Sequence, residues 1–222
     1  MVHHGHDHGY KRLFSHPVMI ADLLRGYVKD PWVEQLDLQT LERMNASYVR
    51  SDLRERADDM VWRVRWRDEK TFMYVYLLLE FQSTSERFMA LRILNYLALL
   101  YEDLYQRNEL TTSGLLPGVL PIVLYQGTKP WRAPQEVAEL IAQVPGGLEA
   151  YQPKLGYLLL EANQPGQPRS SEQHNLVEAL FSLEQSREPA DIERILAKLI
   201  DWLTLAEQRE LRRSFTVWIK EV

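Results

Sequence analysis

The residues best suited to chemistry lie at the end of one apolar run. From Phe72 to Phe81 every side chain is apolar except Glu80, and Gln82 follows two positions later. An ionised carboxylate in such a run is costly to bury unless another group pairs with it. Side chains alternate along a strand, so Glu80 and Gln82 would share one face, roughly 7 Å apart. A carboxylate and an amide oxygen so placed could bind a hard cation such as Mg²⁺.

A second carboxylate could join them from the preceding strand. The stretch from Asp59 to Trp66 alternates after Val61, with Trp62, Val64 and Trp66 on one side and Arg63 and Arg65 on the other. The polar residues 67–70 then form a turn, which predicts an antiparallel hairpin. A turn centred between residues 68 and 69 places Asp59 opposite Leu78, on the face that carries Glu80 and Gln82. A slip of one residue would move Asp59 to the other face.

The surrounding elements predict a mixed β-sheet flanked by helices, of the α/β class. Helical patterns run from Ser15 to about Asp30 and from Glu86 to Gln106, the second capped by Ser83, Thr84 or Ser85. Residues 36–44 read as a short helix or a loop, and residues 47–52 as a short edge strand. Apolar strands are expected at 119–125 and 154–160, with a helix at 134–144 between them. From residue 172 onward the pattern is helical.

Composition excludes several classes of protein. The chain has 222 residues and no cysteine, so zinc–thiolate sites and cysteine nucleophiles are excluded. Its net charge of −5 argues against a generally basic protein that coats nucleic acid. No segment is apolar enough to span a membrane and no signal peptide opens the chain, so we expect a cytoplasmic protein with no membrane partner. Neither a glycine-rich phosphate loop nor a Gly-x-Ser-x-Gly elbow is present. Histidines 3, 4, 6 and 8 indicate either a flexible tail or a metal-collecting segment.

Several blocks of the sequence, in the same order, resemble the Rpn family of recombination-promoting nucleases, also described as YhgA-like transposases. This family is similar to the PD-(D/E)XK nuclease superfamily. The resemblance runs from about His6 to about Asn163. It is carried by residues 6–7 and 10–14, the strand that contains Asp59, and the blocks 78–84, 89–96 and 121–127.

The resemblance implies a restriction-endonuclease-like core with Asp59 and Glu80 as metal ligands. Gln82 stands where the wider superfamily usually has lysine, and Phe81 where many relatives have histidine. Asp7 and Asp22 are the candidates for an acidic residue that many superfamily members carry in the first helix. On this basis residues 1–9 form a flexible histidine-rich terminus, residues 10–163 a nuclease domain and residues 164–222 a helical extension.

These observations together predict a metal-dependent DNA endonuclease associated with recombination or transposition. Asp59 and Glu80 would hold Mg²⁺, with Mn²⁺ or Ca²⁺ as alternatives, and Gln82 would position water or a phosphate oxygen. Arg63, Arg65 or Arg87 would contact the DNA backbone. The alternative is a catalytically inactive member that keeps the fold to bind DNA or a protein partner. A homo-oligomer is left open.

Overall fold

A five-stranded mixed sheet with flanking helices forms the framework, which confirms the predicted α/β class. The computed structural model describes residues 3–44, 59–67, 71–80, 85–127, 129–143, 146–163 and 174–221; at Asp59 and Glu80 it defines the backbone and the strand register. The strands lie in the order β1-β2-β3-β4-β5. Contacts divide the chain into two compact units, residues 42–161 and residues 1–41 together with 162–222.

The predicted hairpin is present with the predicted register. Strands β2 (Asp59–Trp66) and β3 (Phe72–Glu80) pair antiparallel, and Asp59 lies opposite Leu78. The alternation in β2 is also confirmed, because Trp62 and Val64 are buried while Arg65 is exposed. The turn length and the two-residue period of the side chains therefore fix which positions share a face.

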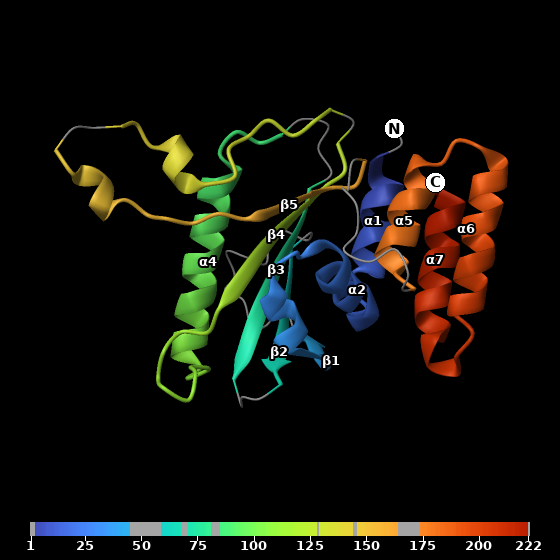
Figure 1. Ribbon diagram of the computed structural model, residues 1–222, viewed down its shortest axis with the longest axis horizontal. Helices are drawn as coiled ribbons and strands as arrows, with labels where there is room; N and C mark the ends of the chain where they lie inside the picture. Colours follow the sequence, from blue (N-terminus) through green and yellow to red (C-terminus); the bar gives the residue numbers. More distant parts are fainter. Residues whose placement is uncertain are drawn as a thin grey trace. The chain divides into compact units, whose positions relative to one another are not determined.

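Helix α4 (Met89–Gln106) connects β3 to β4 (Val119–Tyr125), and these two strands are parallel. Figure 1 shows α4 alongside the sheet, starting at the end where β3 finishes. Its buried residues pack against one face of the sheet, which contributes Val61, Tyr76, Leu78 and Val123 among others. The helix starts later than the predicted Glu86: its N-cap residue is Phe88, which forms no side-chain cap bond.

Residues 36–43 and 134–144 fold differently from the sequence prediction. Residues 36–43 form strand β1 instead of a helix or loop, because their pairing within the sheet overrides a weak local pattern. The helix predicted at 134–144 is only a short 3₁₀ helix, η3 (Val137–Leu140). Its backbone is held by another segment: Glu136 bridges Gly156, and the Val137 N–H donates to the Leu155 carbonyl at 2.9 Å. These bonds replace the bonds that a longer helix would need.

Strand β5 is also shorter than predicted. Strand β5 (Leu158–Glu161) pairs parallel with β4, whereas the prediction began at residue 154. The short 3₁₀ helix η4 (Leu148–Tyr151) precedes it, and Gly147 before this helix has a φ of 81°, a left-handed backbone that glycine adopts without steric cost. The edge strand predicted at 47–52 lies outside the described residues.

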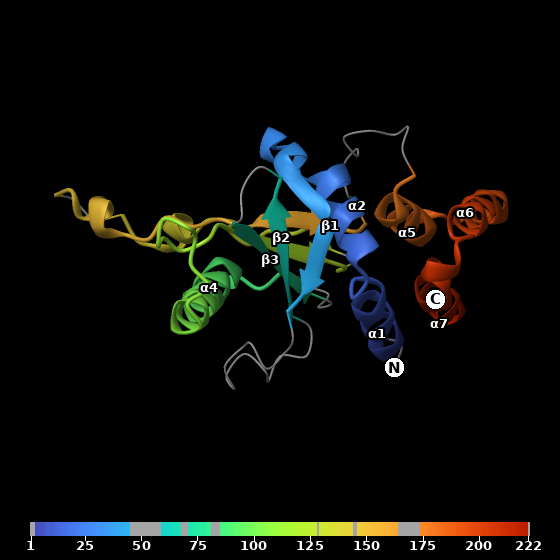
Figure 2. The same ribbon diagram turned by 90° about the horizontal axis from the view of Figure 1, so that it is seen from below.

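The other unit, residues 1–41 and 162–222, is helical apart from residues 36–41 of β1. It contains α1 (His3–Leu13), α2 (Pro17–Tyr27), η1 (Pro31–Gln35), α5 (Leu176–Gln185), α6 (Pro189–Trp202), η5 (Ala206–Gln208) and α7 (Arg209–Glu221). Helix α1 packs on α7, and α2 and α6 both pack on α5. Figure 2 shows α5, α6 and α7 as neighbours seen nearly end-on. No helix in the described ranges is both long and apolar enough to cross a membrane.

The contacts group the two ends of the chain together. Residues 3–9 belong to α1, a helix that packs on α7, so this part of the histidine-rich segment is helical. The C-terminal helices form one unit with residues 1–41. This grouping differs from the division at residue 163 that the extent of the sequence resemblance suggested.

Candidate active site at the sheet edge

One edge of the sheet carries the ends of three parallel strands. Strand β3 ends at Glu80, β4 at Tyr125 and β5 at Glu161. Because β2 runs antiparallel to β3, it begins at this same edge, with Asp59. Ligands of open α/β sheets bind beyond the carboxyl ends of the parallel strands, so this edge is the natural place for a site.

The register brings the two predicted metal ligands to one face. Asp59 lies opposite Leu78, and Leu78 and Glu80 are two residues apart on β3. Positions 59 and 80 are therefore diagonal neighbours, a relation that separates residues by about 7–8 Å. The face is the one on which α4 packs. Gln82 and Phe81, which the sequence also singled out, lie outside the described residues.

A third carboxylate, which is not among the site residues predicted from the sequence, lies in the same row of residues. Glu80 pairs with Tyr125, and Tyr125 pairs in turn with Glu161. The Trp131 backbone N–H donates to Glu161 Oε1 at 2.7 Å, and the Trp131 ring meets Tyr125 edge-on at 4.9 Å between centroids. Glu161 had the same signal as Glu80, since it ends the apolar run Leu158–Leu160. That signal could have identified it.

Asp7 and Asp22 are the two candidates for an acidic residue in the first helix. Asp22 is buried in α2, where its Oδ2 accepts the Leu176 N–H at 2.8 Å and its Oδ1 lies 3.8 Å from Arg25. Burial raises the pKa of Asp22 to about 6. Asp22 thus has a structural role in α2, where it accepts a hydrogen bond from the first residue of α5. The Asp7 side chain lies outside the description, and no group of three or more metal-type ligands occurs among the described residues.

Arg63 and Arg65 lie far along β2 from Asp59. They are four and six residues away, or roughly 13 and 20 Å at the rise of a strand. The Arg63 guanidinium is also engaged, at 2.8 Å from Glu42 and 3.5 Å from Glu109. The structure does not bring these two arginines to the edge that carries Asp59, and their contact with DNA stays a prediction.

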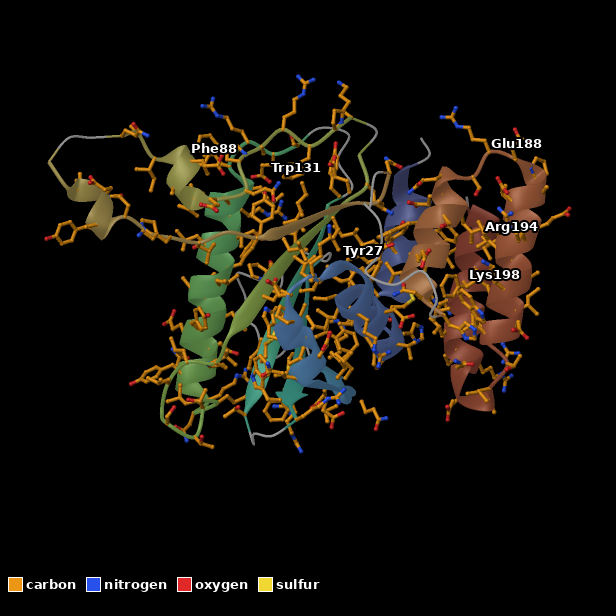
Figure 3. The ribbon with its side chains drawn as sticks, in the orientation of Figure 1. Tyr27, Phe88, Trp131, Glu188, Arg194 and Lys198 are labelled. Atoms are coloured by element: carbon orange, nitrogen blue, oxygen red, sulfur yellow. The ribbon has the colours of Figure 1, made fainter. Side chains whose placement is uncertain are left out.

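Arg87 lies just before α4, in the connection that follows β3. It is exposed, and its guanidinium lies over the Phe88 ring at 5.6 Å. A second loop adjoins this connection, because the Arg132 N–H donates to Ser85 Oγ at 3.3 Å. Figure 3 shows Phe88 and Trp131 at the same end of this unit. Of the three arginines predicted to contact DNA, Arg87 is therefore the one that lies on the connection between β3 and α4.

The sequence of the chain matches one known protein family. Residues 4–213 match the sequence profile of the family described as "Putative transposase, YhgA-like". The chain belongs to this family. The match covers both units, so the YhgA-like family includes the C-terminal helices as well as the sheet.

Curated relatives carry nuclease names. The YhgA-like chain is 30% identical over 122 residues to "Recombination-promoting nuclease RpnA" of Escherichia coli K12, covering 55% of this chain and 40% of RpnA. It is 28% identical over 129 residues to RpnD of E. coli O157:H7, covering 57% and 48% of the two chains. It is 29% identical over 127 residues to "Inactive recombination-promoting nuclease-like protein RpnE" of E. coli K12, covering 57% and 40%.

The chain thus spans less than half the length of these three relatives. No solved structure matches it. The comparisons establish a nuclease-like family that contains both nucleases and proteins named inactive.

Proposed function

We propose that this protein is a metal-dependent DNA endonuclease whose site is the sheet edge that carries Asp59 and Glu80. The observation that carries the proposal is the hairpin register, which places these two carboxylate positions on one face at the end of β3. The similarity to proteins named recombination-promoting nucleases supports DNA as the substrate. A core of the PD-(D/E)XK type is part of the proposal.

The donor set fits a hard divalent cation. Aspartate and glutamate side chains at diagonal positions of a hairpin, about 7–8 Å apart, are long enough to reach one ion between them. Carboxylate oxygens are the preferred ligands of Mg²⁺, which usually keeps several water molecules and binds through one or two carboxylates plus substrate phosphate. Asp59 and Glu80 would hold this ion, and Mn²⁺ or Ca²⁺ could take its place.

The chain's own residues then orient the reaction. When bound, the cation supplies a polarised phosphodiester and a lower pKa for the attacking water. The water gives up one proton to solvent as its oxygen bonds to phosphorus, one phosphorus–oxygen bond of the backbone breaks, and the leaving oxygen takes up a proton from solvent. Gln82 is neutral and is no strong base, so we assign it the positioning of that water or of a phosphate oxygen. Arg87 would hold a neighbouring phosphate.

Nicking of supercoiled plasmid tests the proposal. Asp59→Asn and Glu80→Gln, which keep side-chain size but remove charge, should reduce Mg²⁺-dependent nicking to the background without enzyme. Glu42→Gln removes a carboxylate from the same sheet at a position that pairs with Arg63, and should leave nicking near the wild-type rate. Equal nicking by all four proteins, each with a wild-type melting curve, would exclude this site.

The rival function is a nuclease-like protein that has lost catalysis and binds DNA or a protein partner. Two relatives carry names that include "inactive", which is the specific observation in its favour. Isothermal titration with Mg²⁺ and Mn²⁺ separates the two functions. Binding that disappears in Asp59→Asn supports the endonuclease, whereas no metal binding by the wild type supports the rival.

A further inference from the structure

We propose that duplex DNA docks on two adjoining loops at the site edge, through Arg87, Lys129 and Arg132 and through the exposed ring of Phe88. This proposal deepens the proposed function and rests on it for the identity of the ligand. It moves the main DNA contact away from Arg63 and Arg65 and adds three residues that the sequence did not select.

The two loops are tied to each other and to the site edge by hydrogen bonds. The Arg132 N–H donates to Ser85 Oγ at 3.3 Å, which joins residues 129–132 to the connection before α4. The Trp131 N–H donates to Glu161 Oε1 at 2.7 Å, which fixes the same loop to the last residue of β5. The Trp131 indole Nε1–H also donates to the Ala133 carbonyl at 3.0 Å. Lys129 and Arg132 are therefore exposed residues on an anchored loop.

The positive charge of these loops is available to a ligand. Arg87, Lys129 and Arg132 are all exposed, and none of them forms an ion pair within the described part of the chain. Glu86, the one acidic residue in the stretches 85–88 and 129–132, is paired with Arg92 at 2.9 Å. At the far end of β2, by contrast, Arg63 is held by two glutamates. The three cations on the two loops can therefore contact a polyanion at the site edge without first breaking an ion pair.

Phe88 adds an apolar contact of a kind that DNA uses. Phe88 is 49% exposed at the N-cap of α4, beside Arg87, and Figure 3 shows it at the same end of the unit as Trp131. Exposed rings of this kind stack on bases or wedge between base steps, while neighbouring cations hold the phosphates. The cations would set the register of the DNA on the edge, and the ring would open or bend the duplex next to the proposed metal ligands.

Fluorescence anisotropy with a labelled 20-base-pair duplex tests the cationic part. The measurement is made in EDTA on the Asp59→Asn/Glu80→Gln background, so that neither metal binding nor cleavage contributes. Lys129→Ala/Arg132→Ala should weaken binding and should lower the slope of log K against log salt by about 1.8, which is about 0.9 for each lost phosphate contact. The matched control is Arg67→Ala/Arg107→Ala, which removes two exposed cations that follow the ends of β2 and α4, away from the site edge, and should keep both the affinity and the slope.

A second pair of variants tests the ring. Phe88→Ala should weaken binding about 5-fold or more, the range found for loss of one stacked base, and should leave the salt slope unchanged. Leu91→Ala removes a neighbouring apolar side chain of similar exposure, 51%, and should bind as the wild type does. Lys129→Gln/Arg132→Gln repeats the charge test with longer side chains if the alanine variant melts early.

The outcomes separate this proposal from the endonuclease itself. If DNA binding needs Lys129 and Arg132 but the protein with Asp59 and Glu80 intact never nicks DNA, the docking surface is upheld and the endonuclease is refuted. Nicking that needs Asp59 and Glu80, together with equal affinities of the Lys129/Arg132 and Arg67/Arg107 variants, overturns the docking surface alone. A wild-type protein that binds no duplex also overturns it.

Discussion

At the scale of single residues, Asp22 shows how burial turns a carboxylate into a structural acceptor. Its side chain is 7% exposed, and its Oδ2 accepts the Leu176 N–H at the start of α5. Asn175 completes the junction by donating to the Asp22 carbonyl at 2.8 Å and accepting the Glu178 N–H at 2.9 Å. Burial outweighs both the Leu176 hydrogen bond and the nearby Arg25, so the pKa of Asp22 is raised to about 6.

This raised pKa predicts a pH-dependent stability. The folded pKa lies above the ordinary value of 3.8, so the stabilisation by Asp22 is complete below about pH 4 and is lost as the pH rises through 6. Asp22→Asn keeps an acceptor for Leu176 but cannot titrate. Between pH 4 and 7.5 the wild type should lose up to about 3 kcal/mol of unfolding free energy relative to this variant.

Urea denaturation at several pH values measures that difference. Glu184, whose pKa burial raises to about 7, changes stability with the same sign and is present in both proteins. It therefore cancels when the two curves are subtracted. A wild-type minus Asp22→Asn difference that stays constant across this pH range would contradict the prediction.

The sequence could predict the position of Asp59 but not the role of Asp22. A short turn and a two-residue side-chain period fix the pairing of Asp59 with Leu78, because all the information lies within about 20 residues of chain. Asp22 instead bonds a backbone group 154 residues away. No local pattern specifies such a partner, so the carboxylate looked like a candidate site residue until its contacts were known.

At the scale of elements, the end of β4 is shaped by a close approach. A Cβ built on Gly127 would lie 1.8 Å from Tyr125 Oη and 2.0 Å from its Cζ, so the tyrosine ring occupies the space beside the Gly127 backbone. The same ring meets Trp131 edge-on and is 1% exposed. Position 127 therefore requires glycine, because any larger side chain would clash with the Tyr125 ring.

Gly127→Ala should force the Tyr125 ring out of its place against Trp131. Moving a buried ring by overpacking costs about 1–3 kcal/mol, and we expect that loss in unfolding free energy by urea denaturation. Gly118→Ala is the matched control, because a Cβ at Gly118 meets nothing within 4 Å. A Gly127→Ala protein as stable as Gly118→Ala would show that the ring does not fill this space.

Elements with strong periodic patterns were predictable, and elements that depend on distant partners were not. The strands at 72–80 and 119–125 and the helix at 89–106 carry long apolar signals of their own. The strand at 36–43 and the short turn at 137–140 take their form from bonds to other segments, such as the one between Val137 and Leu155. The sequence therefore predicted the centre of the sheet better than its borders.

At the scale of the whole molecule, the two ends of the chain share one unit. Tyr10 of α1 lies edge-on to Trp218 of α7 at 6.3 Å between ring centroids, and both residues are buried. Gly9 permits this packing, because a Cβ there would lie 2.5 Å from Trp218 Cδ1. Ser214 adds polar links, accepting from Arg12 Nε at 3.2 Å and lying 2.9 Å from His16 Nε2.

Trp218→Ala should loosen α1 although the two lie at opposite ends of the sequence. Removing a fully buried tryptophan side chain costs about 3–5 kcal/mol, and the cavity would face Tyr10 and Gly9. Amide hydrogen exchange should therefore speed up in peptides that cover residues 8–14. Thr216→Ala, on an exposed face of the same helix, should leave those peptides protected. Unchanged exchange in Trp218→Ala would refute the coupling.

The packing of α1 on α7 also sets an order of events during synthesis. Arg12 and its partner Ser214 are 202 residues apart, and ribosomes add about 5–20 residues per second, so α1 waits about 10–40 s for its partner. Residues 42–161 emerge complete within that interval and can fold first. Until α7 emerges, the apolar face of α1, with Tyr10 and Leu13, is without the surface that buries it in the finished protein. The nascent chain is therefore a stronger candidate for chaperone capture than the completed protein.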